Sequence, residues 1–131
     1  MRITRWAAVV ASVLVLLAVG CRGSVPVYNV TGAPVAASKA NPSLDEVSKA
    51  ILRAGATLGW QMKEIKPGYL VGTLNIRKHV AVVDVNYSVK SYSIQYKDST
   101  ELDYDGGNIH PNYNGWIQNL DKGIRAQLST L

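Results

Sequence analysis

The sequence lacks a second cysteine. Its 131 residues hold one thiol, at Cys21, so no disulfide can form within the chain and a domain in an oxidising compartment must be held by packing alone. A long hydrophobic run is missing too. Residues 7–19 are apolar except for Ser12, but about 13 residues fall well short of the roughly 20 that a transmembrane helix needs. This excludes a membrane span in that segment.

The short apolar run has the features of a secretory signal. Arg2 and Arg5 precede it, which gives the positive-then-apolar order of such segments. It ends in LAVGC (17–21), which resembles the bacterial lipobox, where a cysteine receives a diacylglyceryl group before cleavage. A lone exposed thiol would be reactive in an oxidising space. We therefore predict a lipoprotein signal peptide over 1–20 and lipidation of Cys21. A plain signal peptide and a buried N-terminal helix are the alternatives.

The charge balance bears on the class of partner. The chain has 14 basic and 9 acidic residues, a net charge of +5. Removing residues 1–20 takes Arg2 and Arg5 away and leaves 12 basic against 9 acidic residues, a net of +3. The remaining charges are of interspersed sign, unlike the dense basic footprint of a nucleic-acid-binding protein. We therefore expect no nucleic-acid partner.

Composition divides the mature chain into two parts. Residues 21–42 are rich in Pro, Gly, Ala, Ser and Asn and have no sustained periodicity. They predict a flexible tether that follows the lipidated cysteine, with a short strand at 27–30 as its one structured stretch. Residues 43–131 carry regular apolar patterns and are predicted to form a single globular domain.

Helical spacing occurs at both ends of that domain. Ser43 and Glu46 have the spacing of a capping box, apolar residues then recur at steps of three and four up to Leu58, and Gly59 can end the helix. A second helix is predicted after Pro111. Its apolar stripe consists of Tyr113, Trp116, Ile117, Leu120, Ile124, Leu128 and Leu131.

Between the helices the apolar period changes to two. The sequence Lys-Pro-Gly at 66–68 suits a turn between strands at 60–65 and 69–77, and further alternating stretches occupy 80–88 and 91–97. Short strands joined by tight turns predict an antiparallel meander with one buried face. The predicted fold is therefore α+β: a four-stranded antiparallel meander with the N- and C-terminal helices packed on one face, in the order α-β-β-β-β-α.

The opposite face of this sheet is predicted to be polar and open. Such a face, or an unpaired edge strand, can bind a partner. The side chains that the alternation assigns to this predicted binding surface are Thr73, Asn75, Asp84, Asn86, Ser93 and Gln95.

One loop concentrates potential metal ligands. Glu101, Asp103 and Asp105, followed by Asn108 and His110, offer oxygen atoms at alternate positions, which could suit calcium. However, the spacing lacks the twelve-residue calcium-loop pattern, and Asp and Gly residues of this kind commonly form solvated turns. We therefore predict no metal site and no cofactor.

Two alternatives to a binding module stay open. Ser99 and His110, with a nearby aspartate, could form a nucleophile, a base and an orienting group in the 98–110 region of a small hydrolase. The sequence has no nucleophile elbow and no glycine-rich oxyanion loop, so we do not predict an enzyme. His79, at a turn, is assigned to the surface.

The second alternative is a peptidoglycan- or carbohydrate-binding module, because aromatic rings stack on sugars. Tyr28, Tyr69 and Tyr104 are the tyrosines that the pattern leaves exposed. Four other aromatic residues fall on predicted buried stripes and are assigned to the core. These are Tyr92, Tyr96, Tyr113 and Trp116.

Four segments carry a resemblance to a known family. LGWQM (58–62), KPGYLVGTLNIRKH (66–79), YSVKSYSIQYKDSTELDYDG (87–106) and IHPNYNGWIQNLDKGI (109–124) resemble a family of small uncharacterised lipoproteins of Gram-negative proteobacteria. The resemblance covers nearly all of the mature domain. It implies attachment to the cell envelope and supplies no activity, substrate or catalytic residue. Arg22, where inner-membrane lipoproteins carry a retention aspartate, favours the outer membrane.

Together these features predict a lipid-anchored protein that faces the periplasm and works as a binding or assembly-support module. The expected partners are membrane lipid, through the acylated Cys21, and an envelope protein.

Overall fold

The computed structural model describes residues 23–131. The predicted signal peptide and Cys21 lie outside the described residues. The described elements are β1 (Val25–Pro26), β2 (Val30–Pro34), α1 (Leu44–Thr57), β3 (Gln61–Lys66), β4 (Tyr69–Ile76), β5 (His79–Tyr87), β6 (Ser91–Thr100), β7 (Asn108–Ile109) and α2 (Pro111–Leu128).

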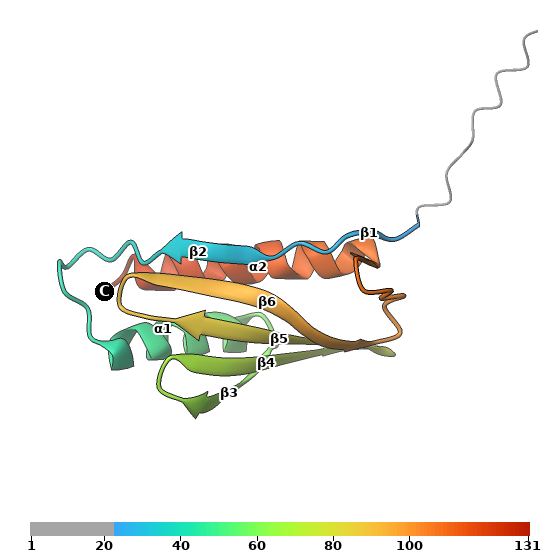
Figure 1. The fold of residues 1–131 in the computed structure, drawn as a ribbon. Coiled ribbons are helices and arrows are strands. Elements are labelled where there is room, and N and C mark those ends of the chain that lie inside the picture. Colours follow the sequence, from blue (N-terminus) through green and yellow to red (C-terminus); the bar gives the residue numbers. More distant parts are fainter. Residues whose placement is uncertain (1–22) are drawn as a thin grey trace, which may run out of the picture.

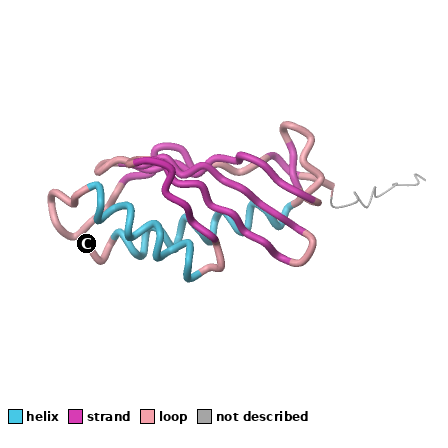
Figure 2. The backbone as a smooth tube through the Cα atoms, turned by 90° about the horizontal axis from the view of Figure 1, so that it is seen from below, coloured by secondary structure: helices cyan, strands magenta, loops and turns pink. Residues whose placement is uncertain are grey.

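These elements form two layers. Five strands pair antiparallel in the order β2-β6-β5-β4-β3, and β1 pairs with β7 in a separate two-stranded ladder. In Figure 1 both helices lie behind the sheet, α2 behind β2 and β6 and α1 behind β5 and β4. Figure 2 shows the helices on one side of the strands only. The predicted α+β class and the placement of both helices on one face are confirmed.

The first helix begins and ends as its sequence predicts. Ser43 Oγ accepts a hydrogen bond from the Glu46 N–H, and Glu46 Oε1 accepts one from the Ser43 N–H, both at 3.1 Å. A hydrogen bond from Lys39, together with these Ser43 contacts, lowers the pKa of Glu46 to about 2. After α1 the chain turns at Gly59, whose φ of +86° is in the region that glycine favours.

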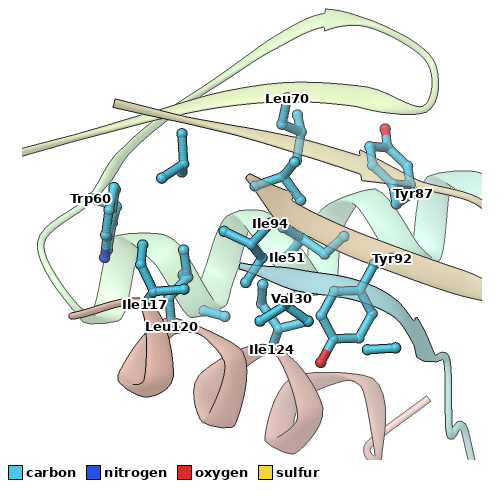
Figure 3. Packing of buried hydrophobic residues seen from close by; sticks show 14 of the residues in the cluster. Val30, Ile51, Trp60, Leu70, Tyr87, Tyr92, Ile94, Ile117, Leu120 and Ile124 are labelled. Carbon is cyan, nitrogen blue, oxygen red and sulfur yellow. The ribbon is translucent and has the colours of Figure 1, made fainter. Parts of the chain in front are cut away.

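The core lies between the two layers. The inward residues of β4 and β5 alternate as predicted, with Leu70, Leu74, Val83 and Val85 buried against the helices. Figure 3 shows this packing, in which Ile51 of α1 and side chains of α2 meet the sheet. The helix residues drawn there from α2 are Ile117, Leu120 and Ile124.

The predicted four-stranded sheet has five strands, β1 and β7 form a ladder that the sequence does not predict, and the strand predicted at 27–30 lies instead at 30–34. Val30–Pro34 forms the additional strand β2 at the edge of the sheet, where Val30 pairs with Ile94 and Ala33 with Tyr92. Only Val30 and Ala33 of this strand are buried, Gly32 lies between them with a φ of +60°, and the register shifts there. This irregular segment has no alternation that a sequence pattern could reveal.

The same finding corrects the predicted tether over 21–42. Both β1 and β2 lie within that range, and beyond β2 the Lys39 N–H donates to the carbonyl oxygen of Leu131 at 3.0 Å. Lys39 Nζ also pairs with Glu46. Residues 25–34 therefore belong to the folded domain, which begins well before residue 43.

One buried polar network joins α2 to the sheet. The hydroxyl of Tyr92 in β6 donates to Asp121 Oδ1, and Arg125 Nε donates to both oxygens of the same carboxylate at 3.2 and 3.3 Å. Asp121 is only 8% exposed, so these donors offset the cost of removing its charge from water. Burial, and then the hydrogen bond to Asp121, raises the pKa of the Tyr92 hydroxyl, which keeps it protonated as a donor.

Two buried tyrosines allow a matched test of this network. Tyr92→Phe removes a donor from a buried carboxylate and is expected to lower the free energy of unfolding by about 1–3 kcal/mol. The Tyr113 side chain is also fully buried, but its hydroxyl has no hydrogen-bond partner among residues 23–131, so Tyr113→Phe is expected to leave stability unchanged or raise it. Urea unfolding of both variants measures the difference. Equal losses would contradict a stabilising role of the Tyr92–Asp121 contact.

Candidate functional site

The face of the sheet that the helices leave uncovered carries all six predicted binding residues. Register brings two pairs of them together across β5 and β6, Asp84 opposite Gln95 and Asn86 opposite Ser93. Thr73 and Asn75 lie on β4, where their cross-strand neighbours are valines of β5. The exposed members are Asn75, Asn86 and Gln95, and the half-buried members are Thr73, Asp84 and Ser93.

A polar cluster spans three strands at the centre of this face. The Tyr69 hydroxyl of β4 donates to Asp84 Oδ1 of β5. Lys97 Nζ of β6 lies 3.4 Å from the same oxygen and donates to the Tyr69 oxygen at 3.3 Å. The hydrogen bond to Tyr69, followed by the charge of Asp84, raises the pKa of Lys97. We call these three residues the face cluster.

The sequence identified only one member of the face cluster. Asp84 is that member; the sequence pattern leaves Tyr69 as an exposed aromatic of the alternative sugar-binding function and places Lys97 at the end of a strand. The register shifts between Val82 and Val83, so that Val82 faces Asp98 while Val83 faces Tyr96. Lys97 is the extra residue of this bulge, which lets its long side chain reach Asp84. No sequence signal marks the bulge.

The face cluster contributes little to folding. Asp84 and Lys97 keep 24% and 45% of their side-chain surface exposed, and ion pairs of this kind are typically worth about 0–1 kcal/mol. The Lys97–Asp84 pair is therefore expected to contribute far less to stability than the buried contacts of Asp121.

The two edges of the sheet are poorly suited to pairing with another strand. The edge strand β3 carries Lys63 and Lys66 and has a register shift between Glu64 and Lys66. The opposite edge, β2, is also irregular and ends at Pro34, which has no N–H. Charges, bulges and proline are the usual means of blocking edge pairing. The open face is therefore a better contact surface than either edge.

A depression of about 640 Å³ lies at the end of β6. The rings of Tyr96 and Tyr104 stack there with centroids 3.9 Å apart. Acidic and hydroxyl side chains from the end of β6 and from the following turn complete the lining, so the depression combines aromatic and hydrogen-bonding surface. Its lining residues are Tyr96, Lys97, Asp98, Ser99, Glu101, Leu102, Asp103 and Tyr104.

The acidic loop serves as a turn. Asp105 Oδ1 accepts from the N–H groups of Asn108 at 2.7 Å and Gly107 at 3.0 Å, and these bonds lower the pKa of Asp105. Glu101 and Asp103 have positive φ values of 58° and 52° and line the depression. Within residues 23–131 no three His, Cys, Asp or Glu side chains gather as a metal site would require.

The hydrolase arrangement is not assembled. Ser99 Oγ shares a hydrogen bond with the Tyr96 hydroxyl at 2.8 Å, while His110 Nδ1 accepts from the Asn112 N–H at 3.1 Å and caps α2. His110 is near His79 instead, with ring centroids 5.9 Å apart. His79 in turn donates from Nδ1 to the Glu101 carbonyl oxygen at 2.6 Å. Both imidazoles therefore have structural partners.

The three predicted surface tyrosines lie apart. Tyr28 precedes β2 and is 37% exposed, Tyr104 is 41% exposed beside the depression, and Tyr69 is held in the face cluster. They form no common aromatic platform. The aromatic residues assigned to the core are buried, in the case of Tyr92 and Tyr113, or partly buried, in the case of Tyr96 and Trp116.

Comparison with known proteins yields no match to a family model, a curated protein or a solved structure. None of the helices in the part of the chain that the structure describes is long and apolar enough to cross a membrane.

The Asp105 turn gives a pH-dependent prediction. Because the folded pKa is lower than the value in an unfolded chain, the ionised carboxylate stabilises the turn above the unfolded pKa, and this contribution is lost as the pH falls through the folded pKa. Carbon-detected NMR titration should find Asp105 titrating below pH 3.8. Asp105→Asn keeps the acceptor oxygen and should keep the loop resonances while removing their acid response. An Asp105 titration at or above 3.8 would contradict the hydrogen-bonded turn.

Proposed function

We propose that the chain is a lipid-anchored binding module of the bacterial cell envelope, which holds a partner protein on the open face of its sheet. The acyl group on Cys21 attaches it to the periplasmic side of the outer membrane. It acts by binding and supports an envelope assembly. Membership of the small proteobacterial lipoproteins that the sequence resembles is part of this proposal.

The observation that carries the proposal is the uncovered sheet face. Two helices bury one side of the sheet, and the other side presents amides, hydroxyls and the face cluster across three strands. These groups are held in fixed positions by the strands, which favours specific hydrogen bonding to a partner surface. The lysine of the face cluster compensates the charge of Asp84, so the face suits a polar protein surface better than a strongly charged ligand.

Photo-crosslinking in intact cells tests this surface. A photoreactive amino acid is placed at Gln95 or Asn75, which are exposed on the face, and at Lys122, which is exposed on α2. We expect the two face positions to capture one and the same envelope protein and Lys122 to capture none. Mass spectrometry identifies the adduct.

A substitution within the face provides the matched control. Asp84→Lys places like charges side by side with Lys97 and should abolish the adduct at Gln95 while the purified variant stays folded by circular dichroism. Adducts that persist in this variant, or that form equally at Lys122, would contradict binding at the open face.

A second candidate function is glycan binding at the depression beside β6. It rests on the exposed ring of Tyr104 with the carboxylates and hydroxyl groups that surround it, because sugars are bound by an aromatic ring together with hydrogen-bonding groups. It is the less favoured function, since Tyr104 is the only tyrosine of the three predicted that lines this site.

Peptidoglycan sedimentation separates the two functions. If the depression binds glycan, the purified domain should pellet with sacculi, and Tyr104→Ala should abolish this while Tyr28→Ala, at an equally exposed tyrosine, should not. We expect instead that neither the wild type nor the variants pellet, because the open face is the binding surface. Pelleting that depends on Tyr104 would favour the glycan-binding function.

A further inference from the structure

The described chain is fixed to the fold almost as soon as it begins. Val25 pairs with Ile109 and Pro26 with Asn108, and the Val27 N–H donates to the Gly107 carbonyl oxygen at 3.0 Å. Asn114 then clamps this segment to the first turn of α2. Its Nδ2 donates to the Pro26 carbonyl and its Oδ1 accepts from the Tyr28 N–H, both at 2.9 Å. Few residues therefore separate Cys21 from the first paired strand.

The length of this link limits where an anchored domain can sit. Four residue steps separate Cys21 from Val25, and an extended chain advances at most ~3.3–3.6 Å per residue, so Val25 lies within about 14 Å of Cys21. A tether of 21 residues, as composition alone predicted, would have allowed any orientation. The end of the domain that holds β1 must instead stay close to an acylated Cys21.

Several segments share the end that holds β1, which we call the anchor end. The β4–β5 turn with Arg77 and Lys78, the loop after β6 and the start of α2 meet there, and the His79–Glu101 hydrogen bond joins the first two. In Figure 1 the chain end marked C and the β5–β6 turn lie at the other end of the molecule. The 18 residues of α2 separate the two ends by about 27 Å, at ~1.5 Å per residue.

We infer that the anchor end faces the lipid headgroups. The open sheet face is thereby held close to the bilayer surface. This orientation rests on the proposed lipidation of Cys21. Exposed Arg77 and Lys78 can contact headgroup phosphates, and Tyr104 has the amphipathic character of an interfacial residue. Asp103 and Asp105 share this end, so net charge does not draw it to the membrane, and the short link decides the orientation.

The orientation narrows the class of partner. A face held beside the headgroups meets proteins that are themselves embedded in or attached to the same membrane. A freely diffusing periplasmic protein would meet the face no more readily than any other surface. The proposed partner is therefore a membrane protein with a polar surface close to the bilayer.

Distance-dependent quenching tests the orientation. The acylated chain is placed in vesicles of phosphatidylethanolamine and phosphatidylglycerol that contain a headgroup-linked quencher. Because Cys21 is the only native cysteine and its sulfur is acylated, a fluorophore attaches only to an introduced thiol. Lys78→Cys reports on the anchor end, and Lys90→Cys, also an exposed turn residue, reports on the opposite end. We expect several-fold stronger quenching at position 78.

Two controls separate orientation from anchoring. A Gly/Ser linker of 20 residues inserted between Gly23 and Ser24 should equalise quenching at the two positions. Cys21→Ser should prevent sedimentation with vesicles, and unchanged sedimentation of that variant would overturn the lipid anchor itself. If the acylated chain sediments but both labels of the unextended protein are quenched equally, the orientation is wrong while the anchor stands.

Discussion

The attachment of α2 to the sheet through a buried carboxylate is the constraint on which the rest of the structure depends. In the described part of the chain Asp121 is the one charged residue that is buried, and it accepts hydrogen bonds from Tyr92 of β6 and from Arg125 of its own helix. The contact with Tyr92 ties the helix to β6. With α2 in place, its first turn lies where Asn114 can hold the N-terminal segment, so the position of β1 follows from the same contact.

Because both helices cover the same side of the sheet, its two faces differ in character. Strand residues that face the helices are apolar and tightly packed, whereas the opposite face mixes polar side chains with the half-buried Val71, Val80 and Val82. The blocked edges leave this face as the broad, regular surface that a partner can contact. The residues that pack the core and those of the proposed binding face therefore alternate along the same strands.

Much of the fold could be predicted from the sequence, because its signals are local. The capping box at Ser43, the Pro67-Gly68 turn and the alternation in β4 and β5 each depend on a few neighbouring residues, and all agree with the structure. The features that escaped prediction depend on distant pairings. β2 has only two buried residues, Lys97 reaches Asp84 through a bulge, and the buried Asp121 finds its partner Tyr92 29 residues away in the sequence.

The two-residue ladder between β1 and β7 has a mechanical consequence. A pull on the N-terminal end of the described chain would act first on this short ladder and on the Asn114 clamp, before any force reached β2 or the core. Peeling β1 away would free the chain as far as Val30 and lengthen the link to about 30 Å, at ~3.3–3.6 Å per residue. If Cys21 is acylated as proposed, this extra length would let the domain move away from the bilayer while β2 and the core stay folded.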